Sequence, residues 1–369
     1  MTAGFRLERR QDPPLALRVA LPVGAIGLGF IAGGIIMLLG GHDPINAYGS
    51  MWDASLGSSD GLTSTFIKAT PLIFTGLAVA AALRVGLWNI GGEGQLIIGA
   101  VGATGIGLFI RGLPGPALLV LMMVGAVAAG AAWALIAAIL RALIGLNEII
   151  VTLFLNYIAI LLMDNLIFGP WGDPKAFGFA YSRALPIDAS LPLIPGTGLH
   201  IGILIALASA GLLWWLIGRT PWGFSIRVTG GNERAAKYLR LPIRRQMIVV
   251  FALSGALAGL AGAIELTGVT HRLQEGISVS YGYTGVLIAF LARERFFQVV
   301  VAAFLFAALV VGSFALQTTG VAQPIVTIIQ AMTIVFLLAG DTLLVYRVRI
   351  VRRARLAVAP APTGSGAES

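Results

Sequence analysis

The stretch from Gly86 to Gln95 concentrates hydrogen-bonding groups between two long apolar runs. It holds the amide of Asn89, the carboxylate of Glu93 and the amide of Gln95 among four glycines. An unpaired polar group in hydrocarbon costs several kcal/mol, so such a cluster lines a water-filled path, binds a ligand or is buried against neighbouring helices. Neutral hydrogen-bonding side chains suit a polar, uncharged ligand. We therefore name these three residues as candidates for the lining of a substrate path.

A second polar cluster opens a later apolar run. It consists of Asn147, Glu148 and Asn156, of which the last two are eight positions apart and share one face of a helix. These residues are further path candidates. The alternative is capping, because Asn89 and Asn147 start helices and glutamates are stabilised by the positive ends of helices. Both interpretations stand equally for Asn147 and Glu148, whereas path lining is favoured for Gln95 and Asn156.

The elements that must position these residues are membrane helices. Hydrophobic residues make up 57% of the 369 residues and charged residues 11%, against about 25% charged in an ordinary soluble domain. The mean hydropathy is +0.91. The sequence predicts an all-α integral membrane protein with ten spans, near 18–40, 66–84, 94–110, 116–140, 148–168, 200–217, 246–266, 281–292, 296–316 and 324–345. The piece at 281–292 is short for a crossing, which predicts a half-helix or a re-entrant segment.

Small residues and isolated charges within the spans have structural interpretations. Gly255 and Gly259 form a GxxxG pair that allows close helix approach. Lys68 lies near the start of a span, where a long cation snorkels to the interface. Glu265 lies near the end of another span, and we expect it to be interfacial.

Basic residues gather in three segments on one side of the membrane. They precede the first span in residues 1–17, fill the loop 219–245 and follow the last span in residues 347–369. The positive-inside rule places all three in the cytoplasm, with a polytopic permease domain at 18–346 between the termini. The end of the 347–369 tail is rich in Ala, Pro, Gly and Ser and is predicted to be disordered.

Composition excludes several functions. The pI of about 10.5 is explained by topology and by attraction to anionic lipid, so no nucleic-acid partner is expected. The chain has no Cys, its three His residues are scattered, and none of its three Lys residues lies in a phosphate-binding loop. We therefore expect no metal site, no cofactor and no catalytic residue, and an enzyme is disfavoured. ATP, if used, must be hydrolysed by another subunit.

The loop 219–245 contains a helix signal of its own. A Gly-Gly turn, Asn232 as an N-cap and the run from Glu233 to Leu241 predict a short surface helix before Pro242. Its small Ala235-Ala236 face fits a groove on a partner. A solvated basic loop that only fixes topology is an equally good interpretation from the residues alone.

Three motifs in order give the chain a specific resemblance. They are Asn89-Ile90-Gly91-Gly92-Glu93-Gly94-Gln95, the run from Asn147 to Ile158, and the loop from Arg227 to Leu241, followed by Phe251 to Gly262. With them the chain resembles permease subunits of bacterial ATP-binding-cassette (ABC) importers of the simple-sugar and nucleoside branch. Glu93-Gly94-Gln95 is similar to the longer of two paired permeases. Two features depart from the family: Arg240 replaces a usual glycine, and Arg293-Glu294-Arg295 replaces a Gly-containing segment.

The resemblance implies a multi-pass protein of the bacterial inner (plasma) membrane that works by alternating access. It implies three partners: a cytoplasmic ABC ATPase, a second, shorter permease in a heterodimer, and a periplasmic or lipoprotein substrate-binding protein. It also implies coupling to the ATPase through the 219–245 loop, at Arg227, Gly230, Asn232, Ala235, Ala236 and Tyr238.

The substrate expected from this branch is a nucleoside. A simple sugar or another small polar metabolite, such as a flavin, is the nearest alternative. A different class, an ion-coupled secondary transporter, is less consistent with the sequence, because the candidate carboxylates lie mostly near span ends.

Overall fold

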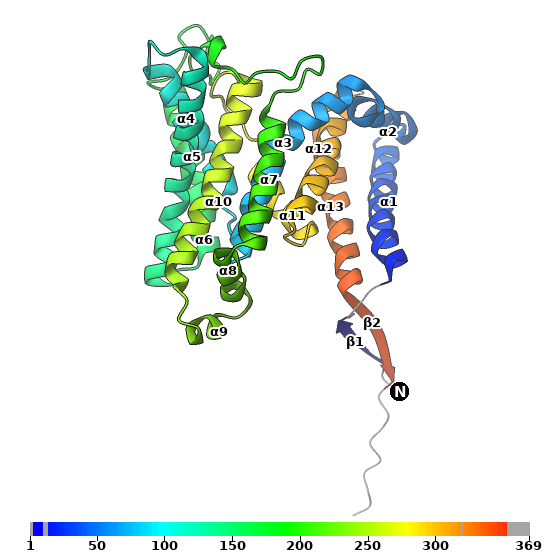
Figure 1. Ribbon diagram of the computed structural model, residues 1–369. Helices are drawn as coiled ribbons and strands as arrows, with labels where there is room; N and C mark the ends of the chain where they lie inside the picture. The colour runs from blue at the N-terminus through cyan, green and yellow to red at the C-terminus, as the bar shows by residue number, and fades with distance from the viewer. Residues whose placement is uncertain (1–2, 10–13, 319, 353–369) are drawn as a thin grey trace, which may run out of the picture. The chain divides into compact units, whose positions relative to one another are not determined.

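The computed structural model of the chain describes residues 3–9, 14–318 and 320–352. Helices form nearly all of its regular structure (Figure 1). The chain divides into two compact units, residues 1–42 with 323–369, and residues 43–322.

The larger unit carries both polar clusters. Its helices are α2 (Pro44–Trp52), α3 (Ser59–Leu83), α4 (Gly92–Phe109), α5 (Gly115–Ile139), α6 (Glu148–Phe168), α7 (Gly202–Arg219), α8 (Pro221–Gly231), α9 (Glu233–Tyr238), α10 (Ile243–Glu265), α11 (Tyr281–Leu291) and α12 (Phe296–Thr318). Single π-helical turns extend α2, α5 and α10, at Asp53–Gly57, Leu140–Ile144 and Leu266–Thr270, and a short 3-10 helix lies at Ile187–Ala189. We call the end of this unit where α8 and α9 lie the α9 end (Figure 1).

Seven helices of the described part of the chain are long and apolar enough to cross a membrane: α3, α4, α5, α6, α7, α10 and α12. Shorter apolar helical segments occupy Gly24–Leu39, Tyr281–Leu291 and Ile325–Gly340. Each predicted span coincides with a helix, and the all-helical membrane architecture is confirmed. Within the described residues seven helices meet the length and hydropathy needed for a crossing, and the count of ten spans stays a prediction. The 281–292 segment is short, as the sequence predicts.

Close glycine contacts hold α4, α5 and α10 together. Gly259 lies against Gly99 of α4 on one side and against Gly130 of α5 on the other, and Gly255 also lies against Gly130. A Cβ atom at any of these positions would collide with the backbone of the neighbouring helix. The predicted GxxxG pair is therefore a packing surface at the centre of the unit, where small residues replace the hydrophobic driving force that lipid cannot supply.

The long loop 169–201 closes the end opposite α9. It pairs with the segment that follows α10, through the backbone hydrogen bond from Ser182 to Leu273 (2.8 Å) and the bridge between Tyr181 and Gln274. This pairing fixes the connection that leads from α10 into α11.

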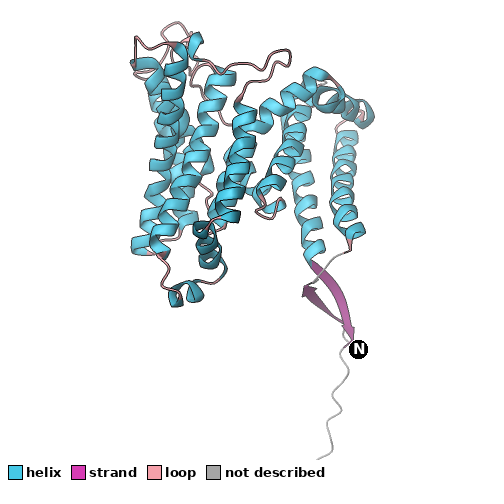
Figure 2. Cartoon of the chain, viewed as in Figure 1, coloured by secondary structure: helices cyan, strands magenta, loops and turns pink. Residues whose placement is uncertain are grey.

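The smaller unit contains α1 (Leu15–Leu39), α13 (Gln323–Val345) and a two-stranded ribbon, β1 (Ala3–Arg9) and β2 (Tyr346–Arg352). The two helices pack together, with Gly29 against the backbone of Thr333. The two strands form an antiparallel ribbon (Figure 2). Ala3 lies opposite Arg352, and Glu8 lies opposite Arg347.

The ribbon corrects the all-α prediction for the two terminal segments. Apolar and charged residues alternate in both, as at Phe5-Arg6-Leu7-Glu8 and Val348-Arg349-Ile350. This alternation is the period of a β-strand. A strand here needs the other end of the chain to supply its backbone hydrogen bonds. The predicted disorder of the tail lies outside the described residues.

Candidate functional site

Asn89 and Gln95 bind each other inside the larger unit. The Asn89 Nδ2 donates to Gln95 Oε1 (2.8 Å), and the Gln95 Nε2 donates back to Asn89 Oδ1 (3.0 Å). Asn89 also donates to Ser254 Oγ of α10 (2.8 Å) and accepts from the Gly91 amide (3.0 Å). All three side chains are buried. The amides thus tie the 84–91 loop, α4 and α10 into one fully hydrogen-bonded group.

Glu93 joins the beginnings of α4 and α11. Its carboxylate accepts a hydrogen bond from the Gly282 amide in the first turn of α11 (2.8 Å) and is buried. A carboxylate at this place is stabilised by the positive end of the helix dipole. Gly282 is needed for the approach, because a Cβ atom there would collide with the Glu93 backbone.

Asn156 on α6 connects both helix beginnings. Its Oδ1 accepts from the Gly94 amide (2.8 Å), and its Nδ2 donates to the carbonyl of Ile90 (2.9 Å) and to the hydroxyl of Tyr283 (3.2 Å). The side chain has no exposed surface. We call Asn89, Glu93, Gln95, Asn156, Gly282 and Tyr283 the α4–α11 junction.

The α4–α11 junction is an interruption of helical structure within the apolar unit. The 11 residues of α11 span about 17 Å, roughly half of a hydrocarbon core. Two helices therefore begin against each other amid amides and one carboxylate. Broken helices of this kind are where membrane transporters place polar substrates, because the free backbone groups and helix ends can bind them.

Asn147 and Glu148 lie away from the junction, at the turn between α5 and α6. Asn147 is exposed and caps α6 by accepting from the Ile149 amide (2.9 Å), so its capping interpretation is confirmed. Glu148 is buried, pairs with Arg141 (3.3 Å) and accepts from the Trp88 amide (3.3 Å). The structure thus brings together four of the six path candidates and separates these two.

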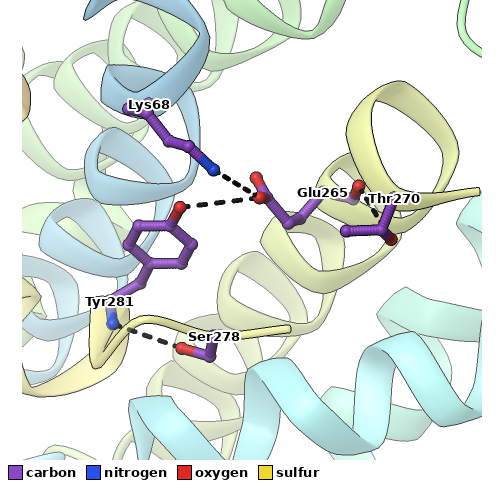
Figure 3. A network of polar contacts seen from close by, with 5 residues as sticks. All are labelled: Lys68, Glu265, Thr270, Ser278 and Tyr281. Carbon is purple, nitrogen blue, oxygen red and sulfur yellow. Dashed lines mark hydrogen bonds and ion pairs between the residues drawn. The ribbon is translucent and has the colours of Figure 1, made fainter. Parts of the chain in front are cut away.

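A charged cluster joins α3, α10 and α11 (Figure 3). Lys68 Nζ lies 2.9 Å from Glu265 Oε1, and the hydroxyl of Tyr281 donates to the same oxygen (3.5 Å). The Lys68 ammonium also lies 5.7 Å from the centre of the Tyr281 ring.

The sequence did not predict the burial of Glu265, which is 2% exposed, and its expected position near a membrane interface stays a prediction. The missed signal is the presence of one cation and one anion in two different apolar spans, which favours pairing.

Capping residues define the two short helices of the 219–245 loop. Thr220 caps α8 by accepting from the Gly223 amide (3.0 Å), and Asn232 caps α9 by accepting from the Ala235 amide (3.1 Å). The predicted helix after the Gly-Gly turn is confirmed as α9, six residues long. The run Thr220 to Gly231, predicted as part of a loop, is mostly a second helix.

The exposed face of α9 differs from the expected one. Ala236 is buried and Ala235 is half-buried, so the small face packs inward. Tyr238 is 88% exposed and Leu239 is 55% exposed. An aromatic and an aliphatic side chain held in solvent on a capped helix form a surface that fits a protein partner.

The remaining coupling candidates, Arg227 and Gly230, belong to α8. Arg227 donates to the carbonyl of Ile217 at the end of α7. Gly230 packs directly on the backbone of Arg84 and Gly86, where the loop leading to Asn89 begins.

Side chains fix α8 to α10 as well. The Thr229 hydroxyl donates to Gln246 Oε1 (2.5 Å), and the Gln246 Nε2 donates to Ser225 Oγ (2.8 Å). α8 thus contacts both α10 and the loop that leads to the α4–α11 junction.

Both departures from the resembled family occupy left-handed backbone. Arg240 has φ 54°, Arg293 φ 47° and Glu294 φ 59°. Glycine adopts this conformation without strain, whereas other residues pay for it. The geometry explains why a glycine suits these positions.

The fold and the junction define a multi-pass membrane transport subunit. Residues 61–338 match the family described as branched-chain amino acid transport system/permease component. The chain is 35% identical to the glucose ABC transporter permease protein TsgB13 of Haloferax volcanii over 99% of both chains. It is 34% identical to the guanosine ABC transporter permease protein NupP of Bacillus subtilis, over 90% of this chain and 94% of NupP.

The nucleoside ABC transporter permease protein NupB of Lactococcus lactis is 30% identical, over 87% of this chain and 90% of NupB. A shorter match, 28% identical over 58% of this chain and 70% of the relative, is to NupQ, another guanosine ABC transporter permease protein of Bacillus subtilis.

The chain belongs to the branched-chain amino acid transport system/permease component family. It is a permease subunit of an ABC importer for sugars or nucleosides and a multi-pass protein of the inner (plasma) membrane. It is a transport component and not an enzyme, because a separate ATPase subunit hydrolyses the ATP. The importer also contains a substrate-binding protein.

Proposed function

We propose that this chain imports a nucleoside by alternating access, with the α4–α11 junction as part of the path. The observation that carries the proposal is the convergence of Asn89, Glu93, Gln95 and Asn156 where two helices begin inside the apolar unit. In the described state these groups bind one another. A substrate with hydroxyls and ring nitrogens can exchange for those hydrogen bonds at little net cost in free energy.

Two observations support a nucleoside as the substrate. NupP and NupB, named as guanosine and nucleoside permeases, match this chain over most of its length. The junction offers amide donors and acceptors, which suit both a ribose and the edge of a base.

A simple sugar is the second candidate, because the glucose permease TsgB13 matches the chain end to end. The amides of the junction serve sugar hydroxyls as well as ribose hydroxyls. Another small polar metabolite would use the same groups.

The α9 end and both termini face the cytoplasm in this proposal. Basic residues support this orientation, since they concentrate in the 219–245 loop and in the segments that flank the first and last helices. The loop 169–201 then faces the substrate-binding protein.

The ATPase docks on α9 and moves α8 in this proposal. Tyr238 and Leu239 form the docking face, together with the neighbouring cavity of about 730 Å³ that Lys237, Arg244 and Arg245 line. Gly230 of α8 presses on the loop that leads to Asn89. Nucleotide-driven movement of α9 would thus shift the populations of the inward-open and outward-open states.

A second, shorter permease completes the membrane pathway as a heterodimer. NupP and NupQ are both named as guanosine permeases of one organism, and this chain matches NupP over far more of its length. The pattern supports a long and a short partner.

Uptake in cells tests the substrate. Radiolabelled guanosine, adenosine, uridine, ribose and glucose are supplied to cells that express the partner subunits at a fixed level, with and without this chain. Loss of nucleoside uptake alone is the expected result. Loss of sugar uptake alone would replace the nucleoside by a sugar, and unchanged uptake of all five would refute both candidates.

A further inference from the structure

A cavity at the α9 end of the larger unit concentrates positive charge. It has a volume of about 350 Å³ and lies between the ends of α3 and α7, α8 and the beginning of α12. Three arginines line it, Arg84, Arg227 and Arg295, beside the aromatic rings of Trp214 and Phe297. Its described lining contains no carboxylate.

The three guanidinium groups are only partly compensated. Arg84 lies 3.8 Å from the carboxylate of Glu294 and also donates to the Glu294 carbonyl. Burial lowers the pKa of Arg84, and repulsion by Arg227 and Arg295 lowers it further against the attraction of Glu294. Three like charges beside one carboxylate leave an excess of positive charge, which an anion would relieve.

A strained turn holds Arg295 at the cavity. The two residues before it, Arg293 and Glu294, both have left-handed backbone, with φ 47° and 59°. This backbone conformation is strained in residues other than glycine. The turn thereby places the Glu294 carboxylate beside Arg84, and it places Arg295 in the cavity lining directly before α12.

The open side of the cavity has the chemistry of a membrane interface. Trp214 is 42% exposed, Phe297 is 54% exposed, and their ring centres are 5.7 Å apart. The Arg219 guanidinium lies 5.0 Å from the Trp214 ring. Exposed aromatic rings beside arginines are typical of the level where lipid headgroups meet acyl chains.

We propose that this cavity binds one anionic phospholipid, with its phosphate among Arg84, Arg227 and Arg295 and an acyl chain along Trp214 and Phe297. Guanidinium groups are suited to phosphate because they donate several hydrogen bonds in a fixed plane. The apolar side of the site distinguishes a lipid from free phosphate. The site is separate from the α4–α11 junction and does not depend on which substrate is imported.

Native mass spectrometry of the complete, delipidated importer tests the site. Phosphatidylglycerol and phosphatidylcholine are titrated into the wild type, Arg295→Gln and the control Arg111→Gln, whose exposed arginine lies outside the cavity. We expect saturable phosphatidylglycerol binding that Arg295→Gln weakens about fivefold, the factor for one cation near an anionic headgroup. Arg111→Gln should bind as the wild type does, and Trp214→Ala should weaken binding of both lipids.

Four results would overturn the proposal. The first is equal binding of the two lipids, and the second is unchanged phosphatidylglycerol binding by Arg295→Gln. The third is displacement of phosphatidylglycerol by millimolar inorganic phosphate, which would identify a free-anion site. The fourth is lipid binding by the isolated permease that the assembled importer lacks, which would assign the cavity to the ATPase interface. Unchanged size-exclusion profiles establish that each variant is folded.

Discussion

Lys68 and Glu265 place two charges inside an apolar unit, and each makes the burial of the other tolerable. Their side chains are 23% and 3% exposed, and the contact joins positions 197 residues apart. Removing one partner leaves an uncompensated charge, which costs about 3 kcal/mol or more, whereas neutralising both is far less costly.

Lys68→Met and Glu265→Gln should therefore each lower the thermal unfolding midpoint of the purified chain in detergent. The double variant should recover most of that loss, because no charge remains buried. Additive losses in the double variant would show that the two charges do not depend on each other.

His200 should make the chain sensitive to acid. The ring is 2% exposed, and burial lowers its pKa, with a further contribution from the Lys68 charge. Below about pH 6.5 the unfolded chain binds a proton at this residue and the folded chain resists it, so stability falls as the pH drops. His200→Leu should lose less stability than the wild type between about pH 7 and about pH 5. Identical pH dependence of the two unfolding midpoints would argue against a buried neutral His200.

The sequence identifies a site residue when the residue is polar within an apolar span. It does not identify contacts that depend on a partner far away in the chain. Asn89, Glu93, Gln95 and Asn156 stand out because apolar spans rarely contain such groups, and the structure brings them together. Their reciprocal bonding and the burial of Glu265 depend on helices far away in the chain. Periodicity within one span carries no information about those contacts.

At the scale of the elements, the glycine contacts of α10 should be intolerant of any side chain. Gly259→Ala places a Cβ atom against the backbone of α5 at Ala126 and Gly130. Gly211→Ala on α7 is the matched control, because nothing lies within 4 Å of the added atom. We expect Gly259→Ala to lower the yield of folded protein and the unfolding midpoint, by about 1–3 kcal/mol in stability. Comparable midpoints for the two variants would contradict the packing account.

The exposed side of α9 should be needed for coupling rather than for folding. Tyr238→Ala removes the one aromatic ring of α9 without changing Ala236, which packs inward. We expect normal membrane insertion, weaker co-purification of the ATPase and reduced uptake. Wild-type ATPase binding and uptake by this variant would exclude α9 as the dock.

Helix positions were largely predictable, because caps and apolar runs are local signals. Asn232 marks the start of α9, and the short run after residue 280 is the short helix α11. The ribbon of β1 and β2 was missed, since its alternating pattern becomes meaningful only when strands from the two chain ends meet. α8 was missed for a similar reason: glycines lower its helix propensity, and Gln246 of α10 supplies contacts that stabilise it.

At the scale of the whole molecule, apolar composition and the distribution of basic residues predict a multi-pass protein and favour one orientation. Family membership adds the ATPase and the substrate-binding protein as partners. The substrate is the part that sequence constrains least, because relatives named for glucose and for nucleosides match the chain almost equally well. In our proposal the amides of the α4–α11 junction can hydrogen-bond to either ligand.

Transport by the reconstituted importer tests most directly whether the α4–α11 junction is part of the substrate path. ATP-dependent guanosine uptake into proteoliposomes is measured for the wild type, Asn156→Ser and the control Asn147→Ser, at equal amounts of inserted complex. Asn156 lies at the junction, whereas Asn147 only caps α6. We expect Asn156→Ser to reduce uptake roughly tenfold, the factor for losing one buried hydrogen-bonded group, and Asn147→Ser to retain most of it. Equal uptake by the two variants would contradict the account.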